Sequence, residues 1–393
     1  MTLTPSDQPL TPTHTPTQAL TPPAQTRPPR EAHRLDEASL GRWLGSHVDG
    51  CEGATVTVRQ FKGGQSNPTY WIGVSHGGGE GDGGEASALT QQLVLRKKPP
   101  GDLLPSAHAV EREYRIMRAL ADTPVPVPPT LALCEDPAVI GTPFFVMRYV
   151  PGRIFWDPSL PEVKDAATRR AIYADFIRAL AALHTVDPAA VGLGDYGKVG
   201  GFIERQVQRW SKQYEASRTG EVRSMNALMA WLAANTPARD ETTLIHGDYR
   251  IDNALFSPEE EGGSGEPRPP RTLAIIDWEL STLGHPVSDL AYLCMGYHLN
   301  LPGRGSLVGV DFAASGIPSE DELVATYCAL TGRDRIDDWP YFMAFGIFRL
   351  AAIAQGVYKR SLQGNASSDD ASMFGAAVGT LSELGCRIAG VTY

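Results

Sequence analysis

The sequence predicts an α+β fold of two lobes, a small antiparallel β-sheet lobe followed by a mainly helical lobe. Three observations support this fold class. Apolar and polar residues alternate as in strands at several places between residues 54 and 150, whereas apolar residues at helical spacing dominate after residue 151. A short apolar run at 144–150 joins the two parts and is closed by Pro151-Gly152. We therefore expect a tail at 1–32, a β-sheet lobe at 33–150 and a helical lobe at 151–393, with the two lobes facing each other across a cleft.

The composition indicates a globular protein and excludes several classes of function. The chain has 393 residues, 42% of them hydrophobic, and its formal net charge of -10 argues against a broad basic surface for nucleic acid. The five cysteines are scattered and form no CxxC pair, as in intracellular proteins with buried thiols. No apolar run reaches the ~18 residues of a membrane span, and the N-terminus lacks the order of a signal peptide. We therefore expect a cytoplasmic protein that contacts neither nucleic acid nor membrane.

Residues 1–32 are expected to form a disordered tail. Leu-Thr-Pro recurs at 3–5, 10–12 and 20–22. Proline removes backbone donors, and the segment has little apolar surface to offset the entropy of ordering. The sequence leaves open whether this tail has any role beyond that of a spacer.

The β-sheet lobe is expected to begin with a helical segment that carries Leu35, Leu40 and Leu44. Strands are then predicted at 54–61, 69–74, 92–96 and 144–150, with an amphipathic helix at 109–120. The Gly-rich stretch 77–84 is interpreted as an insertion in a hairpin loop.

The helical lobe is predicted from longer segments with helical periodicity. These helices are expected at 166–183, 203–216, 225–234, 320–330, 341–362 and 373–389. Two short apolar runs, 254–256 and 273–276, interrupt the helical pattern and are divided by the Glu/Gly/Pro-rich segment 259–270. We interpret the two runs as a β-hairpin.

The most specific signal lies in the segment Leu244-Ile-His-Gly-Asp-Tyr-Arg-Ile-Asp-Asn253 and in Leu273-Ala-Ile-Ile-Asp-Trp-Glu279. An aspartate, four intervening residues and an asparagine, with a second aspartate after a later apolar run, is the pattern by which kinases organise metal and nucleophile. The alternative is an Asx-rich turn that caps helices. Because three elements of the pattern occur together, the pattern favours phosphoryl transfer.

Each residue type in this pattern has a chemical reason. Transfer of a phosphoryl group needs hard oxygen ligands that hold magnesium against the phosphates, and Asn253 and Asp277 fit that role. It also needs a carboxylate that orients the acceptor hydroxyl and takes its proton, for which Asp248 is the candidate. Arg250 is placed to approach the γ-phosphate. His246 is interpreted as a structural residue of the loop, since no second histidine stands at metal-ligand spacing from it.

Five further segments give the sequence a resemblance to a known family. They are Phe61-Lys-Gly-Gly-Gln-Ser-Asn-Pro-Thr-Tyr70, Val94-Leu-Arg-Lys-Lys-Pro-Pro100, Ala109-Val-Glu-Arg-Glu-Tyr114 and Phe348-Arg-Leu-Ala-Ala-Ile-Ala-Gln-Gly-Val-Tyr-Lys-Arg360 with Gln363-Gly-Asn-Ala-Ser-Ser368. With the loop around Asp248 they resemble the aminoglycoside phosphotransferase and choline kinase-like superfamily, in the branch of kinase-like domains associated with acyl-CoA dehydrogenases. The resemblance runs from about Leu35 to the C-terminus. It implies a protein-kinase-like two-lobed fold, ATP as co-substrate and Mg²⁺ as the metal.

The resemblance also implies residues that contact the nucleotide. A turn that covers the phosphates falls on Gly63, Gly64, Gln65, Ser66 and Asn67, where glycines let backbone N–H groups approach oxygen atoms. Arg96 takes the place where protein kinases have lysine, with Glu113 as its acidic partner and Glu111 as the alternative. The linker strand would meet adenine through Met147, Arg148 and Val150.

The acceptor is the least defined part of the prediction. The resemblance places it near Asp248 and the last long helices, where Arg349, Tyr358, Lys359 and Arg360 stand. Basic residues suit an anionic acceptor, and the dehydrogenase-associated relatives point to a hydroxyacyl-CoA. An aminoglycoside-type antibiotic kinase is the alternative within this class, and a nucleotide-binding pseudokinase without activity is the alternative from another class. Oligomeric state and the choice between ATP and GTP are left open.

Overall fold

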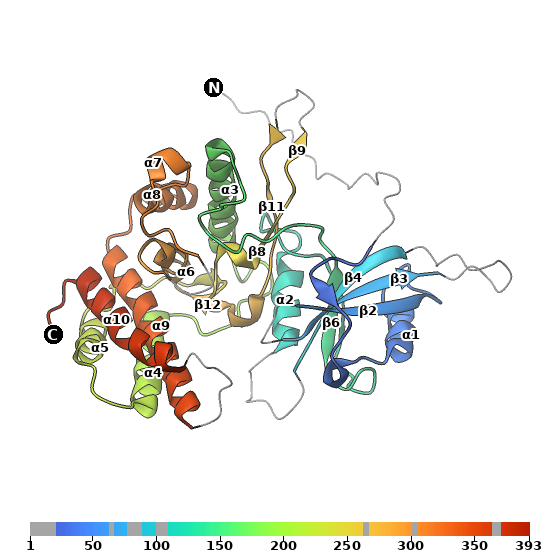
Figure 1. The fold of residues 1–393 in the computed structure, drawn as a ribbon, viewed down its shortest axis with the longest axis horizontal. Helices are drawn as coiled ribbons and strands as arrows, with labels where there is room; N and C mark the ends of the chain where they lie inside the picture. The colour runs from blue at the N-terminus through green and yellow to red at the C-terminus, as the bar shows by residue number, and fades with distance from the viewer. Residues whose placement is uncertain are drawn as a thin grey trace. The chain divides into compact units, whose positions relative to one another are not determined.

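The computed structural model describes residues 21–62, 67–76, 89–99, 109–261, 267–300, 305–363 and 371–393, and the chain divides into two compact units (Figure 1). Unit 1 comprises Met1–Val110 and Leu131–Tyr149, and unit 2 comprises Glu111–Thr130 and Val150–Tyr393. The division after Tyr149 lies one residue from the boundary predicted at 150/151. The helix predicted at 109–120 falls almost wholly in unit 2, although we had placed it in the first lobe.

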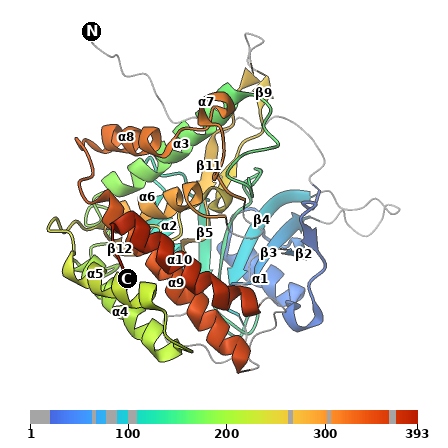
Figure 2. The ribbon, with the colours of Figure 1, turned by 60° about the vertical axis from the view of Figure 1, so that its left-hand side comes forward.

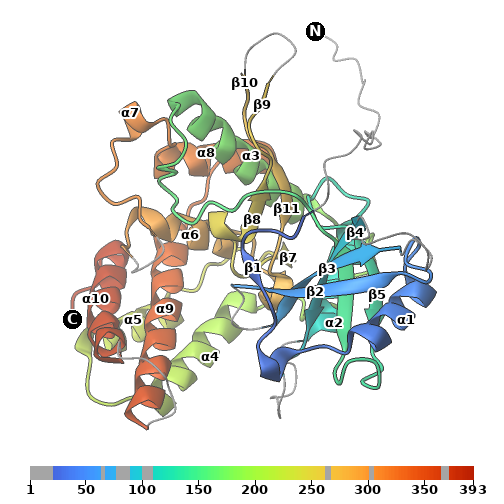
Figure 3. The same cartoon turned by 45° about the vertical axis from the view of Figure 1, so that its right-hand side comes forward.

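Unit 1 is built on an antiparallel sheet with the strand order β1-β2-β3-β4-β6-β5 (Figure 3). Its strands are β1 (Thr26–Arg27), β2 (Thr55–Phe61), β3 (Thr69–Ser75), β4 (Leu89–Lys97), β5 (Thr130–Cys134) and β6 (Phe144–Arg148). Strands β2, β3, β4 and β6 form at the predicted places because each alternates buried and more exposed residues or is buried on both faces. Strand β5 was not predicted.

Helix α1 (Glu37–His47) covers one face of this sheet. The Asp36 side chain caps its first turn by accepting a hydrogen bond from the Ser39 N–H at 3.0 Å. Leu40 and Leu44, one turn apart, are completely buried against Val56 and its neighbours in the sheet. This cluster forms the core of unit 1.

Ordered structure begins earlier in the chain than we predicted. Thr26 and Arg27 pair with Phe61 and Gln60 of β2, and the Arg59 Nε donates to Thr26 Oγ1 at 2.9 Å. A 3-10 turn, η1, follows at Glu31–His33. The disordered tail predicted for 1–32 is therefore wrong for residues 26–32, while residues 1–20 lie outside the described part of the chain.

Unit 2 is mainly helical, as predicted, and its helices pack on one another (Figure 2). Helices α9 and α10 lie side by side, α4, α5 and α6 pack against α9, and α8 packs against α3. The helices are α2 (Val110–Leu120), α3 (Ala166–Thr185), α4 (Phe202–Ser217), α5 (Arg223–Ala234), α6 (Val287–Cys294), α7 (Phe312–Ser315), α8 (Glu320–Thr331), α9 (Trp339–Leu362) and α10 (Ala371–Ala389).

In the described part of unit 2, three short antiparallel strand pairs accompany the helices. The pair β8 (Ala254–Phe256) and β11 (Thr272–Ile275) is the predicted hairpin, and its far end is extended by β9 (Glu260–Glu261) and β10 (Pro267–Arg268). The third pair joins β7 (Thr243–Ile245) to β12 (Thr282–Gly284). The chain that leaves β7 and the chain that leaves β11 carry the residues of the predicted catalytic pattern.

Helix α9 is long and apolar enough to cross a membrane by length and composition, which we had not expected from the sequence. Within the described residues it is the one helix of this kind, and 72% of its most apolar window is buried inside the protein. It therefore has the character of a core helix of unit 2.

Candidate active site

The loop after β7 turns sharply at Gly247. This residue has a φ of +83°, and a Cβ at this position would lie 2.6 Å from the carbonyl oxygen of Leu280. Any side chain would therefore clash with backbone as well as strain the turn. A glycine is required here for the chain to carry Asp248 past the η3 turn (Trp278–Leu280).

Asp289 in helix α6 holds the backbone of this loop through hydrogen bonds. Its two carboxylate oxygens accept hydrogen bonds from the backbone N–H groups of His246 at 2.6 Å and Gly247 at 2.8 Å. Asp289 is 1% exposed, and burial by itself would raise its pKa. The hydrogen bond from His184 and the loop contacts outweigh burial, so the pKa of Asp289 lies below its ordinary value.

His246 is fully buried and acts as a structural link within the loop. Its Nε2 lies 3.0 Å from the carbonyl oxygen of Ile276, and its Nδ1 accepts a hydrogen bond from the Asp248 N–H at 3.3 Å. Because a carbonyl can only accept, Nε2 carries the proton and the ring is the neutral tautomer. His246 therefore ties the chain after β11 to the backbone of Asp248, in keeping with the structural role expected from the sequence.

Asn253 holds the carboxylate of Asp248. Its Nδ2 donates to the Asp248 backbone oxygen at 2.8 Å and to Asp248 Oδ2 at 3.0 Å. Asn253 is 7% exposed and ends the short η2 turn (Ile251–Asn253) before β8. The amide nitrogen thus fixes the orientation of the candidate base, and the amide oxygen is the atom left to bind a cation.

Arg250 stands between carboxylates. Its Nε is 3.5 Å from Asp248 Oδ1, and its Nη2 is 3.1 Å from Asp252 Oδ2. Burial would lower the pKa of Arg250, but Asp248 and Asp252 raise it further above its ordinary value. The Nε and Nη1 atoms are buried and make no hydrogen bond. Arg250 is therefore a fixed cation with donor groups to spare.

Asp277 follows β11 in a left-handed backbone conformation, with a φ of 69° and a ψ of 54°. This conformation is uncommon for a residue other than glycine, although aspartate tolerates it better than most, and it often marks functional sites. The N–H of the preceding Ile276 donates to the Asn253 carbonyl at 2.9 Å. The backbone thus holds Asn253 and Asp277 on neighbouring strand ends.

These two residues fit magnesium. Mg²⁺ in proteins is typically bound by one or two side-chain oxygens and completes its shell with water and substrate phosphates. Asn253 offers an amide oxygen, since its nitrogen faces Asp248, and Asp277 offers a carboxylate. The described residues contain no group of three or more His, Cys, Asp or Glu that could hold a metal ion.

Tyr292 and Arg349 complete the surroundings of Asp248. Tyr292 in α6 lies near Asp248, and its pKa is raised by burial first and then by the charge of Asp248. Arg349 in α9 donates from Nη1 to the Gly247 carbonyl at 3.2 Å, and its Cζ lies 5.5 Å from the centre of the Tyr292 ring. We had listed Arg349 as an acceptor position, whereas nothing in the local sequence identified Tyr292.

In unit 1 the sheet register places Arg96 and Met147 on one face. Val94 pairs with Met147 and Arg96 pairs with Phe145, so Val94, Arg96 and Met147 share a face. Lys97 belongs to the opposite face with Leu95, is 7% exposed, and has its pKa lowered by burial. Among the neighbouring cations of β4, the register therefore favours Arg96 over Lys97 as a phosphate ligand on the face of Met147.

The remaining predicted nucleotide residues are distributed over both units. Gly63, Gly64, Gln65 and Ser66 lie outside the described residues. Asn67 is 1% exposed in unit 1, and Arg148 is exposed at the end of β6. Glu113 is 1% exposed in α2 and belongs to unit 2, as does the half-buried Val150.

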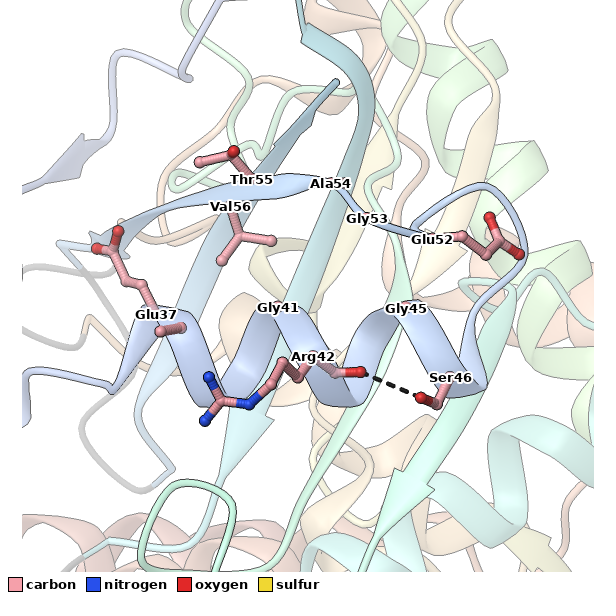
Figure 4. Close-up of a pocket in the computed structure, with 11 residues that line it drawn as sticks. Glu37, Gly41, Arg42, Gly45, Ser46, Glu52, Gly53, Ala54, Thr55 and Val56 are labelled. Atoms are coloured by element: carbon pink, nitrogen blue, oxygen red, sulfur yellow. Dashed lines mark hydrogen bonds between the residues drawn. The ribbon is translucent and has the colours of Figure 1, made fainter. Parts of the chain in front are cut away.

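Among the described residues, each unit contains a hollow. A groove of about 740 Å³ in unit 1 runs between α1 and β2 and is lined in part by Gly41 and Gly45 of the helix (Figure 4). The polar groups along it include Arg42, whose carbonyl accepts from Ser46 Oγ at 3.3 Å, and it contains none of the predicted site residues. A smaller cavity of about 90 Å³ in unit 2 is lined in part by Arg250, Asp252 and Tyr292. The chemistry of the candidate site therefore lies at the smaller hollow.

Comparisons with known proteins identify the family of the chain. The model of the phosphotransferase enzyme family matches residues 57–334, a range that includes Asp248, Asn253 and Asp277. Acyl-CoA dehydrogenase family member 10 of Mus musculus is 44% identical over 365 residues, a match that covers 91% of this chain and 32% of that protein. The chain thus spans about a third of the length of this curated relative.

Solved structures show the same fold. A protein of Ralstonia eutropha, provisionally named an aminoglycoside phosphotransferase, is 43% identical and superimposes with a TM-score of 0.78, covering 91% of this chain and 99% of that chain. A mutant of aminoglycoside phosphotransferase APH(4)-Ia, in a complex with ADP and hygromycin B, is 16% identical with a TM-score of 0.51, covering 89% and 98% of the two chains, and supports the fold alone. The sequence prediction of an α+β, protein-kinase-like fold is confirmed, and the chain belongs to the phosphotransferase enzyme family.

Proposed function

We propose that the protein transfers the γ-phosphate of ATP to a hydroxyl group of a small molecule, with Mg²⁺, and that the acceptor is a hydroxyacyl-CoA thioester. The observation that carries the kinase assignment is the arrangement around Asp248. Its carboxylate is held by Asn253 and faces the Nε of Arg250, while the buried Nη1 of Arg250 makes no hydrogen bond. A phosphoryl group with developing negative charge would supply the acceptor that this nitrogen lacks.

The residues define a transfer step. Asp248 orients the acceptor hydroxyl and takes its proton as the new bond between that oxygen and the γ-phosphorus forms. The bond between the γ-phosphorus and the β,γ-bridging oxygen breaks, and ADP leaves with the electron pair. Arg250 donates to the oxygens of the group in transfer. Bound Mg²⁺, held by Asn253 and Asp277, would neutralise phosphate charge.

The nucleotide contacts form part of the same proposal. Arg96 would pair with the α- and β-phosphates and Glu113 would orient it, while backbone N–H groups at Gly63, Gly64, Gln65, Ser66 and Asn67 would cover the phosphates. Met147, Arg148 and Val150 would line the adenine site. The shared face of Arg96 and Met147 supports this assignment for unit 1.

Two features favour a hydroxyacyl-CoA as acceptor. The cation of Arg349 lies against the Gly247 carbonyl and next to Tyr292, so the surroundings of Asp248 include a positive charge suited to an anionic molecule. The relative in Mus musculus carries acyl-CoA dehydrogenase in its name, which suggests acyl-CoA chemistry for the protein family. A polycationic aminoglycoside is the alternative acceptor, and Arg349 disfavours it.

A pseudokinase is the competing function from another class. It would bind nucleotide without turnover and would typically lack one of the residues that hold metal or orient the acceptor. The presence of Asp248, Asn253 and Asp277 argues against it.

The test is ADP formation with Mg-ATP and a panel of 3- and 4-hydroxyacyl-CoAs, aminoglycosides, choline and sugars. We expect turnover with a hydroxyacyl-CoA and a loss on the order of 10²-fold or more in Asp248→Ala. The exposed Asp122 provides a matched control, and Asp122→Ala should keep the activity. Turnover with an aminoglycoside alone would replace the proposed acceptor, and binding of Mg-ATP without turnover on any acceptor would favour the pseudokinase.

A further inference from the structure

The cavity of unit 2 is apolar over most of its wall. Its lining includes Tyr173, Met295, Tyr297, Leu299, Leu307 and Leu350. The two tyrosine hydroxyls donate to the carbonyls of Pro158 at 2.6 Å and Pro318 at 2.7 Å, so these side chains offer hydrogen-bonded hydroxyls and apolar rings. Trp156, which also lines the cavity, keeps 64% of its surface exposed. The wall therefore suits an apolar group better than water.

The same cavity shares residues with the candidate base. Arg250, whose Nε lies 3.5 Å from Asp248 Oδ1, lines it, and so does Tyr292, which is close enough to Asp248 to be affected by its charge. An acceptor whose hydroxyl lies at Asp248 would thus have a neighbouring part within reach of the apolar wall. The volume of about 90 Å³ corresponds to about three groups the size of water, at roughly 30 Å³ each.

We propose that this cavity binds a short alkyl chain attached to the carbon that bears the acceptor hydroxyl. The inference rests on the proposed function and deepens it, because it defines the acceptor as a secondary alcohol with an apolar branch of about three carbons. Polyhydroxylated acceptors, such as sugars, would leave polar groups against an apolar wall. The cavity therefore contributes both affinity and selection against such acceptors.

Gly296 allows the cavity to be filled without disturbing the backbone. It lines the cavity, its φ is not in the left-handed region, and a Cβ built on it meets no atom within 4 Å. Gly296→Leu should therefore occupy the space of the proposed alkyl chain. Gly379 in α10 is half-buried and also has open space at its Cβ, so Gly379→Leu is a matched control outside the cavity. Leu350→Ala enlarges the cavity from the side of α9.

The experiment uses the full chain with Mg²⁺ and a non-hydrolysable ATP analogue. Calorimetry measures the affinity for 4-hydroxybutanoyl-, 4-hydroxypentanoyl-, 4-hydroxyhexanoyl-, 4-hydroxyheptanoyl- and 4-hydroxydecanoyl-CoA, and turnover with Mg-ATP is measured in parallel. For the unaltered protein and Gly379→Leu, we expect the affinity to rise about fourfold per added carbon up to the heptanoyl compound and not beyond it. Gly296→Leu should abolish this rise, and Leu350→Ala should extend it to longer chains.

The outcomes separate the two proposals. A rise with chain length that persists unchanged in Gly296→Leu overturns the alkyl site, whatever the turnover. A rise that Gly296→Leu removes, without ADP formation from Mg-ATP, supports the alkyl site and contradicts the kinase function. Failure of every thioester to bind contradicts both the alkyl site and the hydroxyacyl-CoA acceptor.

Discussion

The guanidinium of Arg349 donates a hydrogen bond to the carbonyl oxygen of Gly247 at 3.2 Å, which links the long helix α9 to the residue before the candidate base. The Arg349 Cζ also lies 5.5 Å from the ring centre of Tyr292 and 5.7 Å from that of Trp210. Cations over aromatic faces are held in place by the ring quadrupole. Arg349 therefore holds the loop that carries the candidate base Asp248 against α9.

Loss of Arg349 is expected to lower turnover more than it lowers stability. In Arg349→Ala the turn at Gly247 loses its contact with α9, and misplacement of Asp248 should reduce kcat by about 10-fold to 10²-fold. Arg349→Lys keeps the charge and should recover part of kcat. Steady-state kinetics and thermal unfolding measure the two effects, with Arg118→Ala, an exposed arginine in α2, as the control. Unchanged kcat in a folded Arg349→Ala protein would contradict a positioning role.

Removal of the Asn253 side chain should weaken the response to magnesium. Asn253→Ala deletes both the amide that holds Asp248 Oδ2 at 3.0 Å and an oxygen proposed to bind the metal. We expect the Mg²⁺ concentration for half-maximal activity to rise, together with a fall in kcat on the order of 10-fold or more. Titration of activity with Mg²⁺ after chelator treatment measures this. A variant that loses kcat without any change in the magnesium requirement would limit Asn253 to orienting Asp248.

The buried Asp289 should make stability depend on pH in the acid range. Its pKa in the folded protein lies below the ordinary value of about 3.9 expected for the unfolded chain. Its carboxylate therefore stabilises the fold fully above about pH 4, and this contribution is lost as the pH falls through the folded-state pKa. Asp289→Asn should cost about 3 kcal/mol near pH 7, because the N–H groups of His246 and Gly247 lose a charged acceptor.

Urea denaturation of the protein and of Asp289→Asn at about pH 7 and about pH 3 provides the measurement. The difference in unfolding free energy between the two proteins should shrink at the lower pH. Asp321→Asn, at an exposed position in the first turn of α8, serves as the control and should show little difference at either pH. An equal difference at both pH values would exclude the carboxylate charge as the cause.

Much of the fold could be predicted from periodicity in the sequence. Long helices such as α3 and α9 repeat apolar residues over several turns, so their ends were predicted within about two residues. Strands β7 and β12, with three residues each, are too short to show any period. Their pairing joins Thr243 to Gly284, a contact between segments that local sequence does not encode. The short β1 was missed because its partner in β2 lies more than thirty residues away.

The candidate site likewise contains residues that the sequence identifies and residues that only tertiary packing brings together. Asp248, Asn253 and Asp277 stand in a spacing that the chemistry of phosphoryl transfer explains, so sequence alone identifies them as candidates. Tyr292 and Arg349 reach Asp248 and Gly247 through the packing of α6 and α9, so no local spacing identifies their contacts. The grouping of α2 with unit 2 likewise depends on tertiary contacts of Arg112 and Arg115.

Tyr196 should anchor helix α2 within unit 2. Its hydroxyl donates to the Arg112 carbonyl at 3.1 Å and lies 2.8 Å from Ser281 Oγ, while the Arg112 guanidinium stacks over its ring at 4.1 Å. Tyr196→Phe keeps the ring but leaves the Arg112 carbonyl and Ser281 short of a partner, which should cost about 1–3 kcal/mol.

We expect this loss to concentrate in α2, because the hydroxyl of Tyr196 contacts the Arg112 carbonyl in that helix. Hydrogen exchange should show faster exchange of α2 amides in Tyr196→Phe, whereas the amides of α10 should be unchanged. Tyr393→Phe, at a tyrosine that is 54% exposed, controls for the loss of a hydroxyl as such. Equally faster amide exchange in α2 and α10 would mean that the variant destabilises unit 2 as a whole. Unchanged amide exchange in α2 would mean that the Arg112 guanidinium holds the helix without the hydroxyl. Glu113, the acidic partner proposed for Arg96, lies in α2. Only faster exchange in α2 together with unchanged exchange in α10 would therefore make Tyr196 a residue that positions Glu113.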